Sequence, residues 1–123
     1  MEKIESYLIN LGITFEEIAE NTWVIHDPDK GLEQVAVIVD KPLVIIRVKV
    51  MSLPSKNEEE FYKKLLILNG TDLVHGAYAI VDDDVIIIDT LQFETMDLEE
   101  FQASLDAIGL ALAQHYPILS QYR

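Results

Sequence analysis

The sequence predicts one α+β domain over residues 1–123, with a five-stranded antiparallel sheet and helices packed mainly on one face. The expected element order is α-β-β-β-α-β-β-α, in which helices separate groups of strands instead of alternating with single strands. Half of the 123 residues are hydrophobic, which is enough for a sizeable core in a chain of this length. The chain shows no internal repeat and no Gly/Ser/Pro-rich linker, so we expect a single compact unit.

The first half of the chain predicts a helix and then a meander of three strands. Residues 2–11 place apolar side chains at helical spacing, and Gly12 follows as a stop signal. A short extended segment is expected at 14–18. Short turns connect the strands that follow, so an antiparallel meander is expected. Its strands are residues 23–26, 33–39 and 43–51, joined by turns at Asp27–Gly31 and Asp40–Pro42.

The second half predicts a helix, a hairpin and a final long helix. Asn57 with Glu60 resembles a capping box and opens a helix over 58–68, which Asn69-Gly70 would end. Two strands at 73–81 and 85–91 flank a turn of three aspartates. Asp97 with Glu100 opens the last helix, about 98–115. Its apolar side chains recur every three or four residues, so it is expected to cover the sheet, although such a stripe also suits binding of another helix.

Several strands are apolar on both faces, which is unusual for an antiparallel sheet with one wet face. In strand 43–51, the side chains of Val44, Ile46, Val48 and Val50 can face the helices. The other face then carries the side chains that we expect to bind a partner: Leu43, Ile45, Arg47, Lys49 and Met51. A second copy of the chain or a bound client would cover this apolar surface. The alternative is that a helix or the twist of the strands shelters it.

The net charge of −13 is unevenly distributed and excludes several classes of partner. Residues 1–64 hold twelve acids and eight Lys/Arg, whereas residues 65–122 hold ten acids and no Lys or Arg. Binding to nucleic acids or anionic membranes requires cations, so neither is expected as a partner. A basic protein or peptide is allowed. No signal peptide, membrane-length apolar stretch or cysteine is present, which predicts a soluble cytoplasmic protein.

No residue pattern predicts catalysis, a metal site or a cofactor. His26, His75 and His115 lie on different predicted elements without metal-ligand spacing, and we expect each on a strand or helix surface. Asp82–Asp84 lacks the alternation and the glycine of a calcium loop, so a charged hairpin turn is expected. Asp89 interrupts an apolar strand and is the candidate acid for acid–base chemistry with a histidine. The alternative is that Asp89 lies at a strand end and faces water.

From Leu65–Gly70 onward, the chain resembles the YbjN-like family and the related Tir-type type III secretion chaperones. The helix end is followed by a strand at Val74–Ile80, the acidic turn, a strand at Val85–Leu91 and the Asp-capped helix Leu98–Tyr116. The leading helix and meander agree in order, so the resemblance covers nearly the whole chain. It implies a small acidic protein without enzymatic activity, often a homodimer, that binds a segment of another protein.

The function we expect is therefore a non-enzymatic, chaperone-like or regulatory module that binds a client protein through apolar sheet surface as a homodimer, without a cofactor. The alternative is a small-molecule sensor with a pocket between the sheet and the last helix. A simple measurement distinguishes the binding module from the sensor, since a small ligand would raise the thermal stability of a sensor.

Overall fold

A single antiparallel sheet of six strands dominates the computed structural model, which describes residues 2–123. The strand order across the sheet is β1-β2-β3-β4-β6-β5. The strands are β1 (Thr14–Ala19), β2 (Thr22–Asp27), β3 (Leu32–Asp40), β4 (Leu43–Ser52), β5 (Ala77–Val81) and β6 (Asp84–Gln92). The fold class is confirmed, but the expected count of five strands is wrong by one. The segment expected at 14–18 is a full strand, because a tight turn at Glu20-Asn21 folds it back onto β2.

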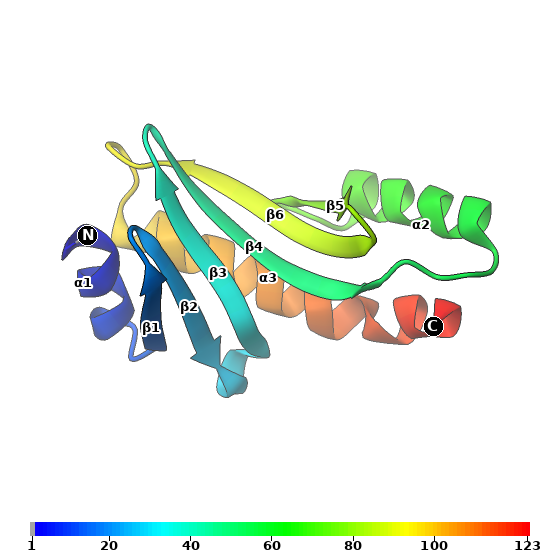
Figure 1. The fold of residues 1–123 in the computed structure, drawn as a ribbon, viewed down its shortest axis with the longest axis horizontal. Coiled ribbons are helices and arrows are strands. Elements are labelled where there is room, and N and C mark those ends of the chain that lie inside the picture. The colour runs from blue at the N-terminus through cyan, green and yellow to red at the C-terminus, as the bar shows by residue number, and fades with distance from the viewer. Residues whose placement is uncertain (1) are drawn as a thin grey trace.

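Three helices accompany the sheet: α1 (Glu2–Asn10), α2 (Glu58–Thr71) and α3 (Leu98–Leu119). Figure 1 shows α3 running behind the plane of the central strands β3 and β4, with α1 near one end of α3 and α2 near the other. Within residues 2–123, no helix lies in front of these central strands in that view. The sheet therefore has an inner face toward α3 and an outer face that no helix covers.

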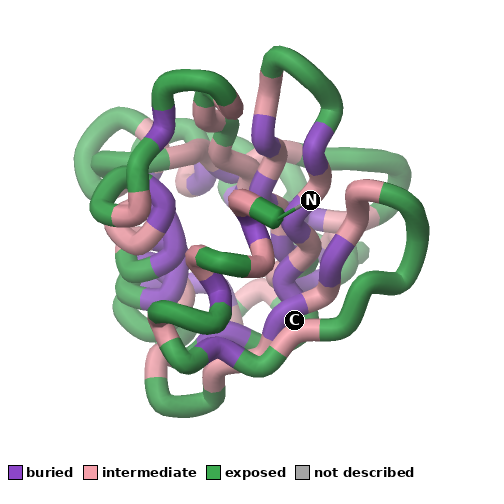
Figure 2. Tube along the Cα trace, turned by 90° about the vertical axis from the view of Figure 1, so that its left-hand side faces the viewer, coloured by how far each residue is buried: buried purple, intermediate pink, exposed green. Residues whose placement is uncertain are grey.

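The core lies between the inner face and the helices. The strand register aligns Trp23, Val37 and Ile46 in one row on the inner face. These side chains belong to one core with Phe101, Leu105 and Ile108 of α3, and all six residues are fully buried. In Figure 2 the buried segments gather inside the fold and the exposed ones lie at turns and outer helix surfaces. The expected role of the last helix as the cover of the sheet is confirmed.

Trp23 belongs to this core and also connects α1 to the sheet. Its side chain is fully buried. The indole Nε1 donates a hydrogen bond of 3.0 Å to Oε2 of Glu5 on α1. A buried indole N–H requires an acceptor, so this bond holds α1 at one orientation over the end of the sheet.

Two glycines permit close backbone approaches. A Cβ atom at Gly109 of α3 would lie 2.4 Å from the carbonyl oxygen of Lys30, so only glycine lets α3 pass the turn between β2 and β3. Gly76 has a φ of +78°, and a Cβ there would lie 2.8 Å from the carbonyl oxygen of Ile88. This left-handed residue directly precedes β5. The strand expected at 73–81 therefore begins only at Ala77.

The helix ends agree only in part with the expectations. Asp97 caps α3 as predicted, since its Oδ1 accepts a 2.7 Å bond from the Glu100 amide. Asn57 is not a side-chain cap; it has a φ of +57° and makes no capping bond. The helix α2 also continues past Asn69-Gly70 to Thr71, because the Asn69 side chain bonds to β5 and leaves the helical backbone intact.

Candidate functional site

The outer face of the sheet carries an apolar surface that crosses five strands. Cross-strand pairing places Ile38 beside Ile45, and Ile88 beside Arg47. Leu43 and Ile45 lie on this face as predicted, and both are partly buried. We call the apolar side chains of this face the outer patch: Val24, Ala36, Ile38, Leu43, Ile45, Ala77, Ala79, Ile86 and Ile88. Neighbouring strands shelter its members in part, which agrees with one of the alternatives drawn from the sequence.

Met51 does not belong to the outer patch, so its expected position is wrong. A β-bulge interrupts the pairing of β4 with β6 between Lys49, which is opposite Ile86, and Met51, which is opposite Val85. The extra residue reverses the side-chain alternation that follows it. Met51 therefore points to the inner face, where it is 6% exposed within the core.

Two cationic side chains lie on the outer face, as the strand pattern predicts. Arg47 is partly buried between Ala36 and Ile88. Lys49 is exposed, and its Nζ lies 3.2 Å from Oδ1 of Asp84 on the neighbouring strand. Exposed ion pairs of this kind contribute little to stability, so the pair of Lys49 with Asp84 adds little to the pairing of β4 with β6.

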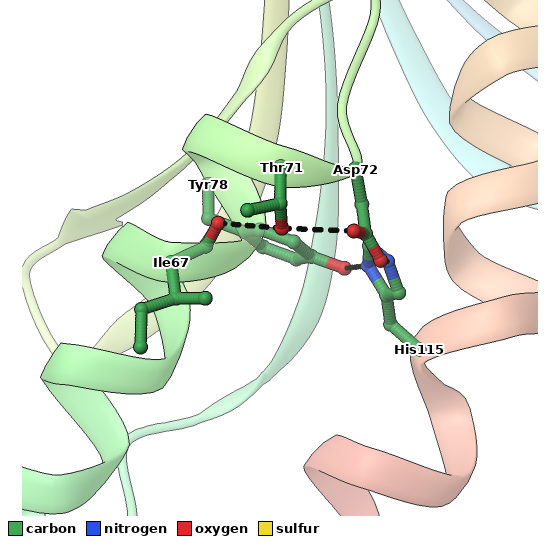
Figure 3. Close-up of polar contacts among 5 residues, drawn as sticks. All are labelled: Ile67, Thr71, Asp72, Tyr78 and His115. Atoms are coloured by element: carbon green, nitrogen blue, oxygen red, sulfur yellow. Dashed lines mark hydrogen bonds and ion pairs between the residues drawn. The ribbon is translucent and has the colours of Figure 1, made fainter.

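A hydrogen-bond network joins the end of α2 to β5 and α3 (Figure 3); Tyr78 and His115 are buried, whereas Thr71 and Asp72 are exposed. Tyr78 Oη lies 2.6 Å from Nδ1 of His115, and Nε2 of His115 lies 3.0 Å from Oδ2 of Asp72. The Asp72 carboxylate can only accept, so Nε2 donates to it and Nδ1 accepts from the Tyr78 hydroxyl. Oδ1 of Asp72 also accepts from the Thr71 hydroxyl at 2.8 Å.

The network is structural in character. His115 is 1% exposed and Tyr78 is 5% exposed, so a substrate has little access to either ring. Burial raises the pKa of the Tyr78 phenol, and the Asp72 charge raises it further. This direction opposes formation of a nucleophilic phenolate. Hydrogen bonds from Thr71 and His115 lower the pKa of the Asp72 carboxyl.

The expected surface position of His115 is therefore wrong, and a signal in the sequence could have found it. The spacing of three and four residues along α3 does not stop at Leu112 but continues through His115 to Leu119. The helix also continues through Pro117, whereas the expected end was residue 115. His115 thus occupies a core position of the helix, and its partners lie 37 and 43 residues away, beyond the reach of local patterns.

Asp89 lies on the inner face and is not paired with a histidine. It is opposite Ile46 in the register and partly buried. Its Oδ2 accepts a 2.6 Å bond from the hydroxyl of the fully buried Ser104. Ser104 and His115 are separated by eleven positions on α3, or about 16 Å along a helix. The acid–base pairing considered for Asp89 and a histidine therefore does not form with His115.

Neither the other histidines nor the aspartate turn forms a metal site. His26 accepts a long bond of 3.4 Å from the Gln34 amide, and His75 is exposed. Across residues 2–123 no group of three His, Asp or Glu side chains is arranged to hold a metal ion. The predicted hairpin turn is present, with Asp82 and Asp83 as its two-residue connection, but Asp84, which was expected in the turn, is the first residue of β6.

One apolar pocket of the structure lies between α2 and β5. Its volume is about 290 Å³, and its lining is Tyr62, Leu65, Leu66 and Asn69 of α2 with residues 78–80 of β5. The sensor alternative placed a pocket elsewhere, between the sheet and the last helix. There, Ile46, Phe101 and Leu105 are fully buried in one continuous core. The sensor alternative thus gains no support at its expected position.

Comparison with solved structures identifies the fold. E. coli YbjN, described as a putative transcription regulator, is 16% identical over 93% of this chain and 89% of its own, with a TM-score of 0.66. A chain of the ExoU–SpcU complex from the type III secretion system of Pseudomonas aeruginosa is 14% identical over 94% of this chain and 97% of its own, with a TM-score of 0.67. A chain of the HopA1–SchA chaperone–effector complex is 4% identical over 91% of this chain and 88% of its own, with a TM-score of 0.68.

A search of curated proteins gives no match. No helix within residues 2–123 is both long and apolar enough to cross a membrane. The family model CesT_Tir_1, which describes secretion chaperones of the type III class, matches residues 1–123. Proteins of that family are non-enzymatic binding proteins. The chain therefore belongs to the CesT_Tir_1 family of type III secretion chaperones.

Proposed function

We propose that this protein is a non-enzymatic binding module that holds a segment of a client protein against the outer patch and works as a homodimer. The observation that carries the proposal is a two-sided apolar sheet with a helix layer on one side only. Partly exposed side chains such as Ile45 and Leu43 gain about 25 cal/mol for each Å² of apolar area that a partner covers. A second protein surface supplies that cover.

The chemistry of the patch suits a protein partner more than a small molecule. Its apolar side chains form a broad surface across five strands, and Arg47 and Lys49 stand among them. A broad apolar surface with interspersed charge is typical of protein interfaces, in which apolar contacts supply affinity and charges set orientation. Several similar structures are complexes of two proteins, among them ExoU–SpcU and HopA1–SchA, which supports a protein client.

The test compares the native chain with Ile45→Asp in two measurements. A charge at the centre of the patch should remove both homodimer formation, measured by sedimentation, and client capture from the native lysate. Ile9→Asp is the matched control, because Ile9 is 69% exposed on α1 and lies outside the patch. Circular dichroism verifies that each variant is folded. If the folded Ile45→Asp variant keeps both the dimer mass and the client capture of the native chain, the proposal is wrong.

A further inference from the structure

The outer patch holds one charged side chain at its centre, that of Arg47 on β4. Cross-strand pairing aligns one row of side chains across five strands, namely Val24, Ala36, Arg47, Ile88 and Ala77. Arg47 is the middle member of this row, and it is partly buried. Along β4, Ile45 and Lys49 are its neighbours on the same face, because side chains alternate in a strand. A partner that covers the outer patch therefore also covers the Arg47 guanidinium.

The charge of Arg47 has no counterpart on the protein itself. Within residues 2–123, its guanidinium takes part in no ion pair and no hydrogen bond. Asp84 is already paired with Lys49, at 3.2 Å. Two other acids of the outer face lie at its margins. Glu16 of β1 is three strands away, or about 14 Å, and Asp40 at the end of β3 lies four residues beyond the row, or about 13 Å.

Water now solvates this guanidinium, and a partner would remove that water. Every buried side-chain nitrogen or oxygen within residues 2–123 has a hydrogen-bond partner, so the unpaired nitrogens of Arg47 are still in contact with solvent. A purely apolar segment would gain free energy at Ile45 and Ile88 but would leave a covered charge without an acceptor, which is costly. A carboxylate avoids this cost, because it accepts two parallel hydrogen bonds from the planar guanidinium.

We infer that the client segment bound to the outer patch carries an aspartate or glutamate, flanked by apolar residues, whose carboxylate pairs with Arg47. The inference rests on the proposed function and adds the chemistry of the client. The net charge of −13 repels an acidic segment at long range, but salt screens repulsion between exposed charges. A pair that forms away from water at the centre of the patch is screened much less.

The test selects peptides from a displayed library of random sequences on the immobilised native chain and on two variants. Peptides enriched on the native chain should contain an acid between apolar residues. Arg47→Met keeps an unbranched apolar side chain without the charge, so apolar residues should still be enriched and the acid should not. Lys49→Met is the matched control, because it removes the same charge from the same face of β4 and should still enrich the acid. Circular dichroism verifies that each variant is folded.

Fluorescence anisotropy then measures the pair with one enriched peptide and its counterpart in which the acid is replaced by the amide. The native chain should bind the acid form about tenfold more tightly. The net charge of the protein alone predicts the reverse order. Arg47→Met should bind the two forms equally. Arg47→Lys should keep only part of the preference, because an ammonium group lacks the two parallel donors.

The outcomes separate this inference from the proposed function. Enriched peptides that are apolar, lack an acid and lose binding to Ile45→Asp would overturn the inference and leave the proposed function standing. Peptides that bind Ile45→Asp as well as the native chain, or no enrichment at all, would overturn both. A preference for the acid that persists in folded Arg47→Met would show that another group recognises it, and the inference would be wrong.

Discussion

Tyr78 Oη and His115 Nδ1 lie 2.6 Å apart in the interior and join the edge strand β5 to the last helix α3. Neither residue contacts solvent to a significant extent. The bond matters for the whole molecule because it joins β5, whose main contacts are with β6 and α2, to the last helix. Removal of the hydroxyl should therefore lower the stability of the whole fold and loosen the pocket between α2 and β5.

Tyr78→Phe should lower the free energy of unfolding by about 1–3 kcal/mol, because Nδ1 of buried His115 loses the hydroxyl that donates to it. Urea unfolding measures this change. The control is Tyr116→Phe, since Tyr116 is 61% exposed on the same helix as His115 and should change stability little. Equal stability of both variants would contradict the account of the network.

The same tyrosine should make stability depend on alkaline pH. The pKa of Tyr78 is raised in the folded protein above the ordinary value of 10.0, so the folded state retains a proton that the unfolded state has lost. This contribution is complete below pH 10 and decreases as pH rises toward the folded pKa. The difference in urea midpoint between native chain and Tyr78→Phe should therefore shrink above pH 10. A difference that stays constant would contradict burial as the cause.

The bond between Asp89 and Ser104 should stabilise the packing of β6 on α3. Ser104→Ala removes the donor to a partly buried carboxylate, and we expect a loss of about 1.5–3 kcal/mol, the usual range for bonds to charged groups. A double-mutant cycle with Asp89→Ala isolates the pair, because each single variant also changes packing. If the two effects were simply additive, the bond would have no role in stability.

Gly109→Ala and Gly70→Ala should have opposite effects, although both place a methyl group in a helix. Alanine favours helix over glycine by about 1 kcal/mol, so Gly70→Ala, which meets open space, should stabilise the protein. At Gly109 the new Cβ would approach the Lys30 carbonyl, and overpacking of this kind costs about 1–3 kcal/mol. Thermal unfolding of the two variants gives the comparison. A stabilised Gly109→Ala would show that α3 is free to move away from this turn.

Sequence patterns predicted most of the architecture because the strands and helices carry strong local signals. The Asp97 cap and the apolar repeat of α3 are both visible in consecutive residues. The bulge that turns Met51 inward is not, because it depends on the pairing of β4 with β6 and not on β4 alone. Asn69 likewise resembles a helix stop in sequence, yet its side chain bonds to β5, which no local pattern reveals.

The outer patch and the pocket between α2 and β5 differ in how far the sequence could reveal them. Leu43 and Ile45 were predicted to share a face because alternation in one strand is enough to show it. The pocket needed the structure, since α2 and β5 meet only through tertiary packing. Its exposed side chains, such as Leu66, carry no signal in sequence beyond an apolar residue beside a helical stripe.

The most direct test of the outer patch is an isoleucine methyl NMR spectrum of the native chain, recorded alone at low concentration and again with its captured client. The account predicts shifts for the methyl groups of Ile38, Ile45 and Ile88, which share the outer face, and none for Ile9 on α1. Unshifted signals from all three outer residues, with the client bound, would contradict the central claim.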